Sequence, residues 1–210
     1  MAVSIQNPHF LMRRLHSLLG LLPVGGFLMF HLWENSQSRF GAQHYNEHVV
    51  GWLQGLNYLV VMEIFVIALP LLFHAGYGLL ILRDGSREWN RFPWLHHRFY
   101  FLQRLSGVAI LLFLLFHVGW TRIYGLYEPA VRLDLFGHMQ HLLSEPWIFA
   151  VYLLGLLLSV FHLSNGLWTM AISWGLTTSA AAQRLWFYAC SGIFLLLSAM
   201  GIHGMLGFVL

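Results

Sequence analysis

Apolar residues along the chain gather in five long stretches that short polar segments separate. The apolar stretches cover about residues 15–34, 58–82, 101–124, 147–173 and 185–208. A helix needs roughly 20 apolar residues to cross the hydrocarbon core of a bilayer, and each stretch is long enough. Polar segments such as Glu34-Asn35-Ser36-Gln37 and Arg83-Asp84-Gly85-Ser86 lie between them. The pattern therefore predicts an all-α integral membrane protein, a bundle of five transmembrane helices.

The composition agrees with this prediction and excludes several classes of protein. Hydrophobic residues make up 58% of the 210 residues and charged residues only 9%, far outside the profile of a soluble globular domain. No linker-like or low-complexity segment divides the chain, so we expect a single transmembrane domain over residues 1–210. The net charge of +3 indicates membrane topology rather than nucleic-acid binding. Cys190 is the only cysteine, which excludes an internal disulfide and a cysteine-ligated cluster.

The arginines predict the orientation of the chain in the membrane. If the N-terminus is cytoplasmic, eight arginines lie on that side and three on the other, as the positive-inside rule requires. The eight are Arg13, Arg14, Arg83, Arg87, Arg91, Arg98, Arg104 and Arg184, and the three are Arg39, Arg122 and Arg132. Five spans then place the C-terminus outside. The expected location is the cytoplasmic (inner) membrane of a bacterium.

Each of the first four predicted spans contains one histidine: His31, His74, His117 and His162. An ionisable residue at that depth indicates a functional site. Helical rise places His74 ~14 Å from the inner face and His162 ~24 Å below the outer face, so both belong to the inner half. His31 and His117 lie ~26 Å and ~20 Å above the inner face, in the outer half.

These two depths predict two pairs of iron ligands. Two imidazoles can bind one haem iron, so we expect His74 and His162 to hold an inner b haem and His31 and His117 an outer one. Glycines near these histidines would make room for a flat macrocycle, although small residues also serve ordinary helix packing. His203 has no second histidine at matching depth, and we expect it to be structural.

Polar side chains at the inner ends of the first and third spans are candidates to bind the haem propionates through charge-assisted hydrogen bonds. They are Arg14, His16, Ser17, Gln103 and Arg104. Glu63 lies inside the outer end of the second span, where a bare carboxylate is expensive. It either handles protons for a quinone or forms a buried hydrogen bond to a neighbouring helix. Residues 131–143 are amphipathic and predict a short helix on the outer membrane surface or facing water.

Distinctive motifs occur in order around all four histidines. They are Phe10-Leu11-Met12-Arg13-Arg14-Leu15-His16-Ser17-Leu18-Leu19-Gly20, Pro23-Val24-Gly25, Phe30-His31-Leu32, Glu63-Ile64-Phe65, Leu69-Pro70-Leu71, His74-Ala75-Gly76-Tyr77-Gly78, Leu102-Gln103-Arg104-Leu105-Ser106-Gly107, His117-Val118 with Thr121-Arg122, and Phe161-His162-Leu163-Ser164-Asn165-Gly166-Leu167-Trp168. Together they resemble those of a known family, the single-chain, two-haem cytochrome b membrane anchors of succinate dehydrogenases and fumarate reductases. The resemblance covers nearly all of the chain, and the fifth span is the least distinctive part.

The resemblance implies more than the spacing does. Such anchors hold a flavoprotein and an iron–sulfur subunit on the cytoplasmic face, and electrons pass between those subunits and menaquinone through two b haems. The subunit itself has no dicarboxylate site, and its four histidines match the axial positions of the family. Some fumarate-reducing relatives carry a glutamate two residues before the fourth ligand, where this chain has Val160. The chain therefore resembles the succinate-oxidising branch more closely.

Two other classes of function stay open at this level. One is the cytochrome b subunit of another quinone-linked complex, such as a quinol:fumarate reductase, a hydrogenase or a formate dehydrogenase. A bc-type cytochrome places two ligands on one helix, which disagrees with one histidine in each of four spans. The other class is a transporter that uses membrane histidines as proton relays and contains no haem.

Overall fold

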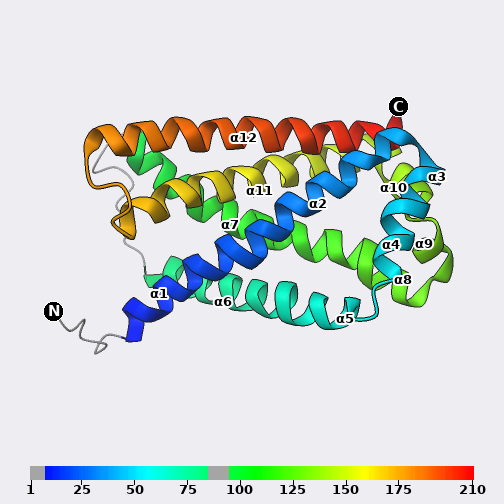
Figure 1. The fold of residues 1–210 in the computed structure, drawn as a ribbon, viewed down its shortest axis with the longest axis horizontal. Coiled ribbons are helices and arrows are strands. Elements are labelled where there is room, and N and C mark those ends of the chain that lie inside the picture. Colours follow the sequence, from blue (N-terminus) through cyan, green and yellow to red (C-terminus); the bar gives the residue numbers. More distant parts are fainter. Residues whose placement is uncertain (1–7, 85–94) are drawn as a thin grey trace.

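The computed structural model describes residues 8–84 and 95–210, and the regular structure within these ranges is entirely helical (Figure 1). Five helical stretches are long and apolar enough to cross a membrane. They are His9–Phe40, Leu59–Arg83, Arg98–Tyr127, Pro146–Ser173 and Ala180–Val209. The predicted all-α bundle of five membrane-spanning helices is therefore confirmed.

The first three spans are each built from several helical elements in series. The first joins α1 (Pro8–Leu19), the π-helical turn η1 (Gly20–Gly25), α2 (Gly26–Ser36) and the 3₁₀ turn η2 (Gln37–Phe40). The second joins α5 (Leu59–Met62), η4 (Glu63–Ala68) and α6 (Leu69–Asp84), and the third joins α7 (Leu95–Val118), η5 (Gly119–Ile123) and α8 (Tyr124–Tyr127). The fourth and fifth are the single helices α11 (Pro146–Ser173) and α12 (Ala180–Val209). π-helical turns are frequent at functional sites, and η5 begins two residues after His117.

The first span is longer than its apolar run predicts. The run stops at residue 34, but the helix continues through Ser36 and the η2 turn as far as Phe40. Gly41 ends it with φ 91°, a conformation that glycine adopts at little cost. As a result, Glu34 belongs to a membrane helix and not to a loop between two spans.

The bundle has two distinct ends (Figure 1). At the first, called here the α1 end, α1 and α12 begin and α6 ends. The C-terminus lies at the opposite end, called here the C-terminal end. This is the arrangement that an odd number of spans produces, and it agrees with the predicted placement of the termini on opposite sides.

Short helices close the C-terminal end, and together they are called here the cap. The cap consists of α3 (Ala42–His44), η3 (Tyr45–Val50), α4 (Gly51–Gln54), α9 (Pro129–Leu133) and α10 (Leu135–Ser144). One part, α3 to α4, follows the first span, and the other, α9 and α10, follows the third. Hydrogen bonds from Asn46 Nδ2 to Asp134 Oδ1 (2.7 Å) and from Gln54 Nε2 to the Arg132 carbonyl (2.8 Å) join the two parts. Asp134 also caps α10, because its carboxylate accepts from the Gly137 amide at 2.9 Å.

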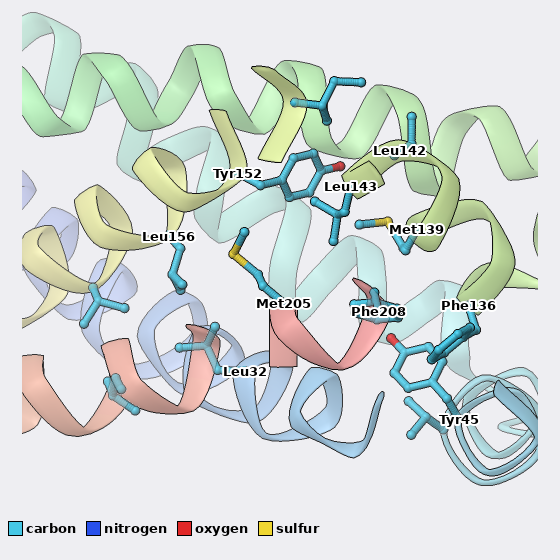
Figure 2. Close-up of a cluster of buried hydrophobic side chains, with 14 of the residues drawn as sticks. Leu32, Tyr45, Phe136, Met139, Leu142, Leu143, Tyr152, Leu156, Met205 and Phe208 are labelled. Atoms are coloured by element: carbon cyan, nitrogen blue, oxygen red, sulfur yellow. The ribbon is translucent and has the colours of Figure 1, made fainter. Parts of the chain in front are cut away.

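The predicted amphipathic helix over 131–143 is divided at Asp134 into α9 and α10. Its apolar side chains Phe136, Met139, Leu142 and Leu143 are buried in the protein's own core, where Phe136 packs on Tyr45 and Phe208 (Figure 2). This packing disagrees with a helix that lays its apolar face on the membrane, and it is compatible with the alternative of a helix whose polar face meets water. The pattern identifies an apolar stripe correctly, but the cap and α12 cover that stripe instead of lipid.

Small residues let α12 approach the first span and α11 closely. A Cβ on Gly204 of α12 would lie 2.8 Å from the Asn35 carbonyl oxygen of the first span, and one on Gly201 would collide with Leu156 of α11. The second span packs more loosely, and Pro70 is the only fully buried residue along 59–83. The buried core thus lies mainly among α2, α11, α12 and the short helices at the C-terminal end.

Candidate functional site

The structure brings the four span histidines together as the two pairs that their depth predicts. The imidazole ring centres of His74 and His162 lie 6.0 Å apart with their planes at 88°. Those of His31 and His117 lie 5.8 Å apart at 70°. Each pair joins two helices that are distant in sequence, and the first pair lies nearer the α1 end than the second.

The outward-facing nitrogens of the first pair are held by backbone carbonyls. His74 Nδ1 donates to the His16 carbonyl at 2.8 Å. His162 Nδ1 donates to the Gln103 carbonyl at 3.1 Å and lies 3.1 Å from Ser106 Oγ. A histidine whose Nδ1 proton is held in this way presents the lone pair of Nε2, as metal-binding histidines do. The hydrogen bonds therefore prepare both rings to act as ligands.

The second pair is held by side chains. His117 Nδ1 lies 3.4 Å from the Tyr152 hydroxyl. His31 Nε2 lies 3.2 Å from Asn35 Nδ2, and the same amide nitrogen donates to the His31 carbonyl at 2.7 Å. Asn35 Oδ1 in turn accepts from the Tyr45 hydroxyl of the cap at 3.1 Å. His31 is thus connected to the cap through Asn35.

Glycines allow the first pair and its neighbours to approach closely. A Cβ on Gly20 would collide with the His74 ring, and one on Gly107 would lie 3.1 Å from His162 Cε1. Other small residues that the sequence singles out have a different environment: a Cβ on Gly26, Gly76 or Gly119 would have no neighbour within 4 Å. Some glycines therefore admit the histidine rings, and others lie against open space.

The residues present fit a haem bound between the rings of each pair. Imidazoles on opposite sides of one metal ion have ring centres roughly 6 Å apart, since a metal–nitrogen bond is about 2 Å long. The observed 6.0 and 5.8 Å agree with this spacing. In addition, His16 stacks on His74 with ring centres 4.1 Å apart, and its buried Nδ1 has no hydrogen-bond partner. A bound group could satisfy this polar atom.

The structure gives the predicted propionate-binding residues several other contacts. The Arg14 guanidinium lies over the rings of Phe10 (4.9 Å) and Trp174 (5.0 Å), and the Arg104 guanidinium lies 4.3 Å from the Tyr100 ring centre. The Ser17 hydroxyl donates to the Arg14 carbonyl and accepts from Trp174 Nε1.

Gln103 spans the gap between α7 and α11. Its amide nitrogen donates to the His162 carbonyl at 3.0 Å, and its amide oxygen accepts from Asn165 Nδ2 at 2.8 Å. This contact set gives Gln103 a role in placing His162, which the sequence does not indicate.

Glu63 pairs with Arg122 across the second and third spans. Two hydrogen bonds, from Arg122 Nε (2.8 Å) and Nη2 (2.7 Å), reach the two carboxylate oxygens. The side chains are partly exposed, 41% for Arg122 and 30% for Glu63. Each residue lies in a π-helical turn, η4 for Glu63 and η5 for Arg122. The carboxylate is therefore held in place by a cation and is still partly exposed.

Glu34 is a further acidic residue that sequence reasoning missed. It lies three residues beyond His31, it is only 5% exposed, and its Oε1 atom is buried without a hydrogen-bond partner. Burial, followed by the negative charge of Glu34, raises the pKa of the Tyr45 phenol above its usual value. The sequence does not indicate this burial, because the polar run that begins at Glu34 is typical of the start of a loop.

Comparison with known proteins gives a strong similarity over nearly the whole chain. The chain is 37% identical over 203 residues to the succinate dehydrogenase cytochrome b558 subunit of Bacillus subtilis (strain 168). The alignment covers 97% of this chain and 98% of that relative. No family model matches the chain.

Proposed function

Because the chain belongs to the family of succinate dehydrogenase cytochrome b subunits, we propose that it carries electrons between the iron–sulfur subunit of that enzyme and menaquinone. It would do so through two b haems, as the membrane anchor of the complex. The observation that carries this proposal is the presence of two imidazole pairs at different depths in the bundle. The ring centres lie 6.0 Å apart within the first pair and 5.8 Å apart within the second.

In this proposal His74 and His162 hold the inner haem, and His31 and His117 hold the outer one. A bound haem iron supplies one-electron chemistry, because it changes between the ferric and ferrous states. The chain's own residues place the ligands: the carbonyls of His16 and Gln103 hold the inner imidazoles, and Tyr152 and Asn35 contact the outer ones. Arg14, His16, Ser17, Gln103 and Arg104, at the α1 end, are the candidates to bind the propionates of the inner haem.

We assign the α1 end to the cytoplasm, where the flavoprotein and iron–sulfur subunits would dock. The basis is the excess of arginines predicted on that side, of which Arg87 and Arg91 lie outside the described residues. A photo-crosslinker placed at Arg98 should reach the iron–sulfur subunit, and one at Arg132 in the cap should not. The reverse result would invert the assigned orientation.

The proposed menaquinone site lies at the C-terminal end near the outer haem, with Glu63 as its proton-handling residue. A quinone takes up two protons with its two electrons, so it needs a titratable group within reach. Glu63 meets this need because it is partly exposed, and Arg122 fixes its carboxylate in one orientation. His44 and His48 of the cap, whose rings stack 4.6 Å apart, are candidates to assist at the surface.

The purified complex tests this function directly. We expect the flavoprotein and iron–sulfur subunits to copurify with the chain, together with two haems per chain. Glu63→Gln should lower succinate:menaquinone turnover at least tenfold, while both haems and turnover with a soluble dye acceptor are retained. Glu128→Gln is the matched control, because Glu128 is exposed beside the cap. Normal menaquinone turnover in Glu63→Gln would show that Glu63 only joins two helices.

A further inference from the structure

Glu34 has surroundings that the electron-transfer role described above does not explain. Glu34 is only 5% exposed, and its Oε1 atom has neither solvent contact nor a hydrogen-bond partner. An unpaired carboxylate in such a place is unstable unless another charge or a proton compensates it. No solvent reaches Oε1, so the simplest species that can satisfy this oxygen is a proton.

The position of Glu34 relates it to the outer iron site. It follows His31 by three residues on the same helix, so the two side chains lie on neighbouring positions of one helix face, ~4.5 Å apart along the axis. Charges interact strongly over such distances when water is excluded. An electron added at the outer site would therefore strengthen proton binding at Glu34, and its removal would weaken it.

We propose that Glu34 takes up one proton when the outer haem is reduced and releases it when that haem is oxidised. The inference rests on the proposed outer haem at His31 and His117. The electron would come from the proposed inner haem, and one proton from water at the C-terminal end would convert the Glu34 carboxylate to the neutral acid, so the net charge of this region would not change. This assigns to Glu34 a redox-linked proton site that is separate from the quinone-reactive Glu63.

The other titratable groups around α2 do not replace Glu34 in this role. Tyr45 of η3 lies nearby, but its phenol donates to Asn35 and stays neutral because its pKa is raised. On η2, the Arg39 guanidinium bonds the Leu206 carbonyl at 3.4 Å. On α12, His203 is exposed, and Tyr188 and Arg184 lie toward the α1 end. The nearby His31 is an iron ligand in this proposal. Glu34 is therefore the acidic group in the described part of the first span that can follow the charge of the iron.

Potentiometric titration of the purified, haem-loaded complex at pH 6 to 9 tests the inference. In the wild type, the midpoint potential of the outer haem should fall as the pH rises. The slope should approach about 59 mV per pH unit, the value for one electron and a tenfold change in proton concentration. In Glu34→Gln the slope of the outer haem should be lost, while the inner haem behaves as in the wild type. Glu128→Gln is the control and should keep the wild-type slope.

A second readout is made first on the wild type, so its main result does not depend on how a variant folds. The infrared spectrum of the reduced minus the oxidised wild-type complex should contain the C=O stretch of a newly protonated carboxyl group, and Glu34→Asp should shift this band. Equal slopes in the wild type and Glu34→Gln, or a wild-type spectrum without the band, would overturn the role of Glu34. A complex that contains no outer haem would instead refute the proposed function on which this inference rests.

Discussion

Gly20→Ala is expected to disturb the inner histidine pair through a single added methyl group. The new Cβ would overlap Cε1 and Nδ1 of His74, so the ring must move away from the His16 carbonyl that it bonds at 2.8 Å. Overpacking costs about 1–3 kcal/mol, the lost hydrogen bond about 0.5–1.5, and alanine recovers up to about 1 through its helix propensity. The net expected destabilisation is about 0.5–4.5 kcal/mol.

Haem content and thermal loss of the inner-haem absorbance measure this effect in the purified complex. Gly76→Ala is the matched control, since a Cβ on Gly76, two residues from His74, has no neighbour within 4 Å. The control should keep both haems and be unchanged or more stable, by up to about 1 kcal/mol. If Gly20→Ala retained the inner haem and unfolded like Gly76→Ala, the close approach of the first span to His74 would be refuted.

Three further predictions concern the supporting contacts. Gln103→Ala removes the amide that joins the His162 carbonyl to Asn165, and it should lower inner-haem retention with a cost of about 1–3 kcal/mol, measured by haem loss on heating. Asp134→Ala removes the cap of α10 and its bond to Asn46, and it should lower thermal stability by about 1–2 kcal/mol without changing the haem spectrum. Because the pKa of Tyr45 is raised in the folded state, the folded chain holds its proton more tightly than the unfolded chain does. Stability should therefore fall as pH rises above about 10, and Tyr45→Phe should weaken this alkaline loss in thermal unfolding experiments.

Much of the fold and the histidine pairing can be predicted because the bilayer imposes simple rules. A span needs a fixed length of apolar sequence, and constant helical rise converts sequence position into depth. These two rules suffice to match His74 with His162 and His31 with His117, although the paired residues are far apart in sequence. The rules fail at the ends of helices, where a polar residue such as Glu34 can stay helical and become buried by a neighbouring element.

Contacts between distant segments could not be predicted from the same pattern. The partner of Glu63 is Arg122, 59 residues away, and no local signal relates the two. The apolar stripe of α10 looks the same whether lipid or protein covers it, and only the folded cap shows that Tyr45 and Phe208 do. Similarly, the contacts of Gln103 with α11 depend on the angle at which α7 and α11 pack, and the sequence pattern does not predict that angle.

The most direct test of the central claim is the reduced-minus-oxidised visible spectrum of the purified wild type and three variants, with haem counted per chain. The wild type should hold two b haems, His74→Ala should lack the inner one, and His31→Ala should lack the outer one. His203→Ala, which changes an exposed histidine of α12, should retain both. Two haems in either His74→Ala or His31→Ala, or none in the wild type, would contradict the assignment of these paired histidines as the haem ligands.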